Sequence, residues 1–207
     1  QKKGKKVPKQ DIEKARGREI KEIPKLGYKV IETDDAEKFK KEIKKHPDVE
    51  HMQEAVLHSI LISDSYYSEQ LNLKSINAEE AWKYSLGEGV VVAVLDTGVN
   101  YAHPDLNDNY MGGYDFVDED NDASDDNGHG THVAGIIAAE MNGVGIVGVA
   151  PKARILAEKV LDSMGVGYDY DVASAIVHAA DNGAAIISMS FGGAYSKVIE
   201  DAVEYAY

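Results

Sequence analysis

The 207-residue sequence contains no cysteine, which excludes a disulfide framework, a thiolate metal site and a cysteine nucleophile. It also lacks any apolar run near the roughly 18 residues that a membrane helix requires, so no membrane span is predicted. Basic residues are in the minority, with 22 Lys and Arg against 36 Asp and Glu and a net charge of −14. This balance argues against nucleic acid as a partner, because phosphate binding requires many Lys or Arg side chains.

The few basic residues are unevenly placed. Residues 1–60 carry 16 Lys and Arg and 12 Asp and Glu, a net charge of +4, whereas the rest carries 6 and 24, a net charge of −18. Such a change predicts segments with different roles. We expect a basic, poorly ordered segment over 1–26, a small segment over 27–62 and a larger domain over 63–207.

The small segment shows weak secondary-structure patterns. Residues 28–32 predict a short strand, residues 35–46 predict an amphipathic helix with an aspartate cap, and residues 49–61 predict a second strand that runs into a tail. The sequence begins at Gln1 without an apolar leader. We interpret this start as a processing boundary, with targeting information expected outside the sequence.

One short apolar run is informative about the fold. Residues 90–95 are six consecutive apolar residues between Gly89 and Asp96. A run of this kind predicts a strand buried on both faces of a parallel sheet. Residues 153–160 and 184–190 predict further strands, with helical spacing between them. We therefore expect an α/β fold in which ligands bind at the carboxyl ends of the strands, where Asp96 lies.

Two motifs carry an acid and a histidine among small residues. The first is VLDTGV, in which Asp96 ends the apolar run and HPDL follows shortly afterwards. The second is NGHGTHVAG, in which His129 stands 33 positions after Asp96. Together with GVAP, KVL and SMSFGG further along, these motifs resemble the subtilisin-like serine proteases (subtilases, peptidase S8), especially thermitase-like members. The resemblance covers about residues 63–207.

The resemblance implies a subtilisin-like parallel sheet with helices on both faces and a calcium-stabilised serine endopeptidase. In that chemistry a serine attacks the peptide carbonyl, an imidazole takes the serine proton and a buried carboxylate orients the imidazole. The last two roles fall to His129 and Asp96. The serine of the family lies in a Gly-Thr-Ser motif that this sequence does not contain. We therefore expect a chain truncated before the serine, an inactive fragment of a longer enzyme.

The resemblance also implies a cleft in which a polypeptide substrate lies as an added β-strand. Two short segments would form its walls, Gly165, Val166 and Gly167 on one side and Ser190, Phe191 and Gly192 on the other. Without the resemblance, Gly165 and Gly167 fit an ordinary turn equally well.

Calcium is the implied metal. Seven acidic residues crowd positions 115–126, and calcium prefers such hard oxygen ligands. In thermitase-like members a loop of this place and length binds calcium, which implies a site made of Asp115, Asp118, Asp120, Asp122 and Ser124. A second family site would use the side chains of Asp64, Asp105 and Asn142 and the carbonyls of Glu140, Val144 and Ile146. A solvated acidic loop is the alternative for the first site.

The family further implies that the start of the chain is a propeptide. Residues 27–61 resemble, by position, the second half of an inhibitory propeptide whose tail lies in the cleft. Cleavage is expected near Leu61, within the range from Leu57 to Ser63. The basic propeptide would complement the acidic domain in charge. The expected partners are polypeptide substrates and this intramolecular inhibitor, and we expect a secreted monomer.

Other classes of protein stay open on the residues alone. Asp-Thr-Gly at 96–98 is also the motif of aspartic proteases, which need two such carboxylates and are therefore disfavoured. A non-enzymatic pseudoprotease or a calcium-binding module would need no serine. His132 lies three positions after His129, so the two histidines could both bind zinc. A zinc site requires at least one further ligand, which disfavours this alternative.

Overall fold

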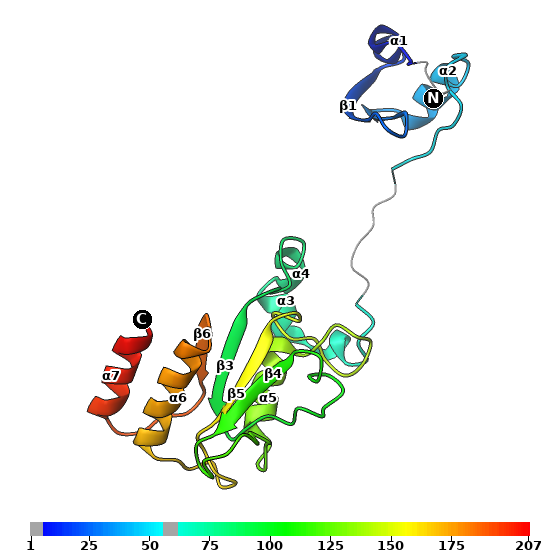
Figure 1. The fold of residues 1–207 in the computed structure, drawn as a ribbon. Coiled ribbons are helices and arrows are strands. Elements are labelled where there is room, and N and C mark those ends of the chain that lie inside the picture. Colours follow the sequence, from blue (N-terminus) through cyan, green and yellow to red (C-terminus); the bar gives the residue numbers. More distant parts are fainter. Residues whose placement is uncertain (1–5, 56–61) are drawn as a thin grey trace. The chain divides into compact units, whose positions relative to one another are not determined.

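The computed structural model describes residues 6–55 and 62–207. The chain forms two compact units, Gln1–Ile60 and Leu61–Tyr207 (Figure 1). The division lies two residues before the boundary expected after residue 62. None of the helices in the described ranges is long and apolar enough to cross a membrane.

The N-terminal unit is built from four short elements. α1 (Lys9–Lys14) leads into β1 (Gly17–Ile23), which pairs antiparallel with β2 (Tyr28–Thr33), and α2 (Ala36–Ile43) follows. The Asp35 side chain caps α2 by accepting a hydrogen bond from Lys38 N at 3.0 Å. One apolar cluster joins these elements, made of Val7, Ile12, Ala15, Phe39 and Ile43 with Ile31, Val49 and Met52 beside it.

Two predictions for this unit are wrong. Residues 9–23 are not poorly ordered, because α1 buries Ile12 and β1 begins at Gly17. A Cβ on Gly17 would lie 2.4 Å from the Phe39 ring, so glycine permits the close packing of β1 on α2. The lysine-rich composition of this segment gave no indication of that packing. Residues 49–55 form no strand, since Val49 and Met52 pack on the apolar cluster instead. The remainder of that predicted strand, 56–61, lies outside the described residues.

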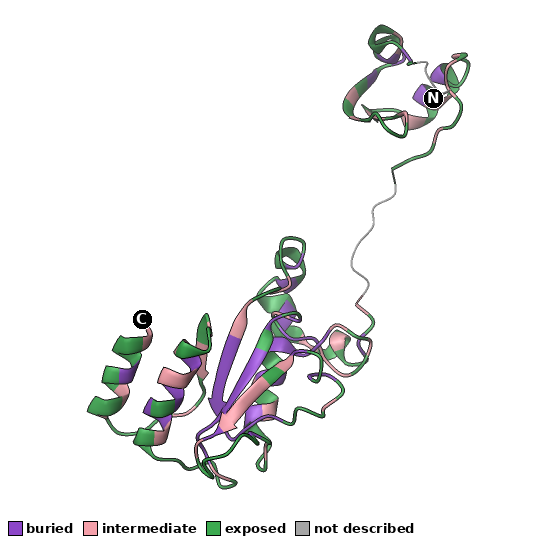
Figure 2. Cartoon of the chain, in the orientation of Figure 1, coloured by how far each residue is buried: buried purple, intermediate pink, exposed green. Residues whose placement is uncertain are grey.

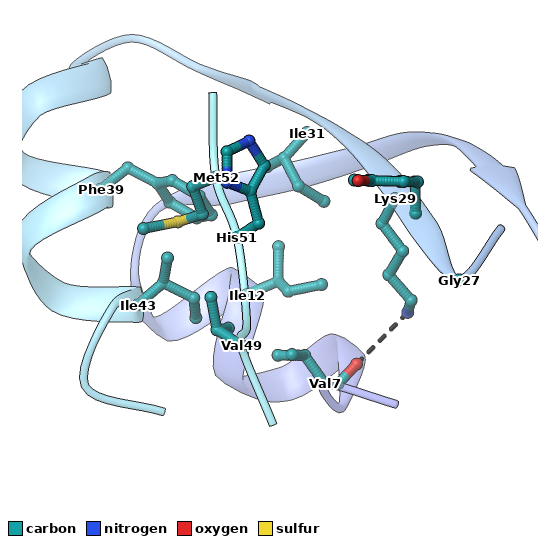
Figure 3. Close-up of a pocket in the computed structure, with 11 residues that line it drawn as sticks. Val7, Ile12, Gly27, Lys29, Ile31, Phe39, Ile43, Val49, His51 and Met52 are labelled. Atoms are coloured by element: carbon teal, nitrogen blue, oxygen red, sulfur yellow. Dashed lines mark hydrogen bonds between the residues drawn. The ribbon is translucent and has the colours of Figure 1, made fainter. Parts of the chain in front are cut away.

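A small cavity of about 90 Å³ lies inside this unit (Figure 3). Ile12, Phe39 and Ile43 are among the apolar side chains around it. At its edge, Lys29 Nζ donates a hydrogen bond to the Val7 carbonyl at 3.2 Å and pairs with Glu19 at 2.6 Å. The lining of this cavity is largely apolar, and the cavity is partly open to solvent.

A parallel four-stranded sheet forms the centre of the larger unit. Its spatial order is β4 (Tyr110–Asp115), β5 (Arg154–Lys159), β3 (Val91–Asp96) and β6 (Ile186–Met189), and every neighbouring pair is parallel. The central strands β3 and β5 are almost wholly buried (Figure 2). The predicted parallel α/β fold is confirmed, and β3 lies where the apolar run predicted a strand.

The sheet has an apolar core on each face. On one side, Val92 and Val94 of β3 pack with α5 (His129–Ala138), and on the other Ala93 and Leu95 pack with α6 (Asp169–Asp181). α7 (Lys197–Ala206) packs on α6 (Figure 1). The short helices η1 (Tyr67–Glu69), α3 (Leu71–Ser75) and α4 (Ala78–Ala81) precede the sheet.

Strand β4 was not predicted, because its sequence contains two glycines in place of a β-branched run. Close packing between neighbouring strands explains the glycine at position 113. A Cβ there would lie 2.0 Å from the carbonyl oxygen of Ala157 on β5, so only glycine allows the two strands to meet at this point.

Candidate active site

Asp96 and His129 form a hydrogen-bonded pair at the carboxyl end of β3. Asp96 is the last residue of β3 and is 1% exposed, whereas the side chain of His129, the first residue of α5, is 51% exposed. The ring Nδ1 lies 2.7 Å from Oδ1 of Asp96. A buried carboxylate at Nδ1 fixes the tautomer and leaves Nε2 to exchange protons with a bound molecule. The structure thus brings the two predicted catalytic residues together.

Glycines on both sides of His129 allow α5 to begin directly against the sheet. Gly128, at the N-cap, has a φ of 107°, which residues other than glycine rarely adopt. A Cβ on Gly130 would lie 2.1 Å from the carbonyl oxygen of Gly98. The small residues of the His motif therefore set how closely the histidine approaches the strand end.

From the sequence alone, Asp125 counts only as one acid of the crowded loop. In the structure its carboxylate accepts several hydrogen bonds from the segments that carry Asp96 and His129. Its Oδ1 accepts hydrogen bonds from Thr97 Oγ1 at 2.8 Å, Gly128 N at 2.9 Å and Asn127 N at 3.0 Å. Its Oδ2 accepts from Thr131 N at 2.9 Å and from the Thr131 hydroxyl. Burial acts to raise the pKa of Asp125, but the bonds from Thr131, Gly128 and Asn127 together hold it below the ordinary value.

Lys159, likewise not predicted as a site residue, is a buried cation beside the pair. It ends β5 directly opposite Asp96 and is 3% exposed. Its Nζ donates to the carbonyls of Thr97 at 2.9 Å and Leu161 at 3.2 Å, and to Asp126 Oδ1 at 2.8 Å. Three acceptors offset the cost of burying the ammonium group and hold the backbone just after Asp96.

The predicted cleft walls surround a cavity of about 880 Å³ between the segment before α6 and the β6–α7 loop. Five of the six predicted residues line it: Gly165, Val166, Gly167, Phe191 and Gly192. Ser190 is not among the lining residues. A Cβ on Gly167 would lie 1.9 Å from the Val160 carbonyl oxygen, so glycine is required in that wall. Much of the lining is apolar, with Val172 and Ile199 among its residues, and suits an apolar side chain.

The first predicted calcium set does not converge on one point. The Asp115 Oδ1 accepts from Val117 N and Asp118 N, and Asp120 Oδ1 accepts from Asp122 N at 2.8 Å. Likewise, Asp122 Oδ1 accepts from Ser124 N at 3.2 Å. Over residues 6–55 and 62–207, no three Asp, Glu, His or Cys side chains gather as metal ligands. The loop uses its carboxylates on its own backbone, so a calcium ion here stays a prediction.

The second predicted set is brought together around two buried carboxylates. Asp64 Oδ1 accepts from Asn142 N and Gly143 N, both at 3.1 Å, and Asp105 Oδ2 accepts from Ile146 N at 2.9 Å. The other oxygens, Asp64 Oδ2 and Asp105 Oδ1, are buried and have no hydrogen-bond partner among the described residues. Such oxygens are what a hard cation would satisfy, so the residues present fit calcium.

The remaining members of that set lie in the same loop. The Glu140 backbone N donates to the Asp105 carbonyl at 2.9 Å, and the Asn142 side-chain oxygen accepts from Val144 N at 2.9 Å. Burial raises the pKa of Asp105, and the nearby Asp64 and Glu140 charges act in the same direction. A bound cation would remove that repulsion.

A second carboxylate–imidazole pair lies between the sheet and α6 and was not predicted. Glu158 on β5 is fully buried, and its Oε1 lies 2.8 Å from Nδ1 of His178 on α6. The ring of His178 packs against the rings of Tyr114 and Phe116, at centroid distances of 5.9 and 5.8 Å. Burial raises the pKa of Glu158 to about 7, opposed by the hydrogen bond and charge of His178.

Comparison with known proteins identifies the class to which this fold and site belong. The model of the subtilase family, peptidase S8, matches residues 87–206. The chain is 42% identical over 186 residues to the thermophilic serine proteinase of Bacillus sp. (strain AK1), covering 87% of this chain and 46% of the relative. It is 47% identical over 148 residues to thermitase of Thermoactinomyces vulgaris, covering 70% and 53%.

Solved structures agree. A protease from Pseudoalteromonas arctica PAMC 21717 superposes with a TM-score of 0.64 at 32% identity, over 70% of this chain and 55% of that one. Other relatives include a protein named a minor extracellular protease, from Bacillus subtilis, and one named an intracellular serine protease, from Paenibacillus polymyxa.

The chain belongs to the subtilase family of serine proteases, and the parallel sheet is the subtilisin-like fold. It spans about half the length of the first two curated relatives. The match to the strain AK1 proteinase covers 87% of 207 residues, about 180, which exceeds the 147 residues of Leu61–Tyr207. That similarity therefore includes residues of the N-terminal unit.

Proposed function

We propose that this chain carries the aspartate and histidine of the catalytic triad of a subtilisin-type serine endopeptidase. The observation that carries the proposal is the 2.7 Å hydrogen bond between a buried Asp96 and a half-exposed His129. His129 takes the proton of the serine hydroxyl through Nε2 and later returns it to the leaving amine. Asp96 orients the ring and stabilises the imidazolium that forms.

The nucleophile in this proposal is the serine of a Gly-Thr-Ser motif, which these 207 residues lack. A longer form of the protein would supply it, and the 207 residues alone would be inactive. The test is hydrolysis of a fluorogenic peptide by this chain and by the product of the coding sequence continued past codon 207. Turnover by the 207-residue chain that disappears in His129→Ala would overturn the assignment of the nucleophile. A native stop codon after Tyr207 would favour a pseudoprotease.

The substrate class in the proposal is an extended polypeptide. A peptide strand laid between the walls that contain Gly167 and Phe191 places an apolar side chain in the 880 Å³ cavity. Glycine in the wall leaves backbone N–H and C=O groups accessible to the peptide. Cleavage should therefore prefer substrates with an apolar residue at the position that fills this cavity.

Calcium is proposed as a stabilising ion held by Asp64, Asp105 and the 140–146 loop. It would neutralise two buried carboxylates and takes no part in the proton transfers of His129. EDTA is expected to lower the melting temperature by about 5–10 °C, the size that follows from a few kcal/mol of linked binding in a chain of this length. Scanning calorimetry with and without calcium measures the shift.

The control for calcium uses two neighbouring aspartates. Asp105→Asn should abolish the effect of EDTA on the melting temperature. Asp108→Asn should keep it, because Asp108 is an exposed residue on the loop that carries Asp105. If adding calcium back to the EDTA-treated chain does not restore the melting temperature, the proposed site does not bind calcium.

We also propose that the N-terminal unit is a propeptide that inhibits the catalytic unit. The net charge of +4 over residues 1–60 complements the −18 of the remainder, and the strain AK1 proteinase is similar across both. The expected junction near Leu61 lies at the edge of residues 56–61, outside the described ranges. N-terminal sequencing of the mature protein is the test, and a mature chain that starts before residue 50 would refute the proposal.

Secretion and a monomeric state complete the proposal. A relative named extracellular supports secretion, while the one named intracellular makes measurement necessary. Immunoblots of medium and cells from the source organism decide the first question. Light scattering of the purified protein decides the second.

A further inference from the structure

The acidic loop and the end of β3 are joined through a single side chain. The Asp125 carboxylate accepts hydrogen bonds from two separate parts of the chain: Thr97, directly after Asp96, and the backbone of 127–131 around His129. Every one of these partners donates, and three of them are backbone N–H groups that can do nothing else. The two segments are those that carry Asp96 and His129.

We propose that Asp125 is a positioning residue for the acid–base pair, holding the start of α5 against the end of β3 so that the His129 ring meets Asp96. This inference rests on the proposed function, in which that pair performs the proton transfers. Asp125 touches neither the ring nor the reacting atoms and acts through Thr97 and Thr131.

Thr97 is the link that makes the connection continuous. Its hydroxyl donates to Asp125 and accepts from Gly130 N at 3.0 Å, and its own backbone N donates to Asp96 Oδ1 at 2.7 Å. Thr97 is 1% exposed, so water does not compete for these bonds. The Thr97 hydroxyl therefore links Asp125 to Gly130, the residue after His129. Thr97 itself directly follows Asp96 in the chain.

An amide cannot take the place of the Asp125 carboxylate. An asparagine has one acceptor oxygen, so its NH₂ group would face either Thr131 N or the N–H groups of Asn127 and Gly128. In either orientation a backbone donor at the start of α5 loses its partner. Asp125→Asn should therefore weaken the hydrogen bonding at the start of α5, although the side chain at position 125 keeps nearly the same volume.

The neighbouring Asp126 provides a matched control. It carries the same charge and contacts the same region, but through Lys159 Nζ at 2.8 Å, and its side chain is 54% exposed. In Asp126→Asn, Lys159 Nζ still donates hydrogen bonds to the carbonyls of Thr97 and Leu161. Asp125→Asn and Asp126→Asn thus remove equal charge, and only the first breaks the connection to α5.

The experiment follows the Nδ1–H proton of His129 by NMR in the whole 207-residue chain, with ¹⁵N-labelled histidine and His129→Ala for assignment. Asp125→Asn should make exchange of this proton with water at least tenfold faster, while Asp126→Asn should stay within twofold of the parent. Equal exchange in both variants would overturn the inference. If the parent shows no protected Nδ1–H, the Asp96–His129 pair itself is wrong and the proposed function fails separately.

A second variant decides the matter if Asp125→Asn does not fold. Thr97→Val keeps shape and burial and removes only the linking hydroxyl. Faster Nδ1–H exchange in this variant supports the positioning role, and unchanged exchange overturns it. In a form of the protein that carries the serine, the same change should lower kcat about 10–100-fold with KM within twofold, the pattern of a misplaced base rather than of weakened substrate binding.

Discussion

Replacing His129 with alanine, in a form of the protein that carries the serine, is expected to lower kcat for peptide hydrolysis by about four to six orders of magnitude. Without the imidazole, the serine proton has no acceptor and the leaving amine no donor. Asp96→Asn should cost about four orders of magnitude, because an amide favours the wrong tautomer of the ring. Single-turnover kinetics with a chromogenic peptide measure both losses.

His132 is the natural control for this experiment. It lies three residues further along α5, is also exposed and makes no hydrogen bond to Asp96 in the described structure. His132→Ala should retain activity within a few-fold of the parent. A loss in His132→Ala as large as that in His129→Ala would contradict the assigned roles and point to a need for both histidines.

The stability of the chain is expected to fall between about pH 5 and pH 7 because of Glu158. Its pKa rises from 4.5 to about 7 on folding, mainly through burial. The folded chain therefore holds a proton that the unfolded chain has already released, and this contribution is complete below pH 4.5 and lost as the pH rises through about 7. A shift of this size corresponds to about 3 kcal/mol of unfolding free energy.

Glu158→Gln isolates this contribution from the other buried acids. Burial also raises the pKa of Asp105 and Asp115, and both remain in the variant. Glutamine can still accept the hydrogen bond from His178 but cannot ionise. Urea unfolding from pH 4 to pH 8 should show a loss of stability that is larger in the parent than in the variant by about 3 kcal/mol. Parallel curves would mean that Glu158 stays ionised when folded.

Features with a strong local sequence pattern were the ones that the sequence predicted correctly. The six apolar residues before Asp96 require burial on both faces, and β3 lies there with α5 and α6 on opposite sides. The glycines around His129 permit one close approach of helix to strand, and the structure contains it. In both cases a short stretch of chain determines its own environment.

Features that depend on distant residues were missed. Asp125 matters because Thr97 and Thr131 lie beside it, and Glu158 because α6 brings His178 onto it. Neither contact follows from periodicity. β1 was missed for a related reason: its alternating charged residues are stabilised by pairing with β2, which a composition rich in lysine did not indicate. The erroneous strand over 49–55 shows the converse, since apolar residues there pack rather than pair.

Strand β6 has a consequence for handling the protein. It is an outer strand of the sheet in the described structure, only four residues long, and it exposes Ile186 (54%) and Met189 (39%). An open strand edge with aliphatic side chains can pair with the same edge of another molecule, and its shortness limits but does not remove that tendency. Solubility at high concentration is then expected to depend on this edge as well as on the overall charge of −14.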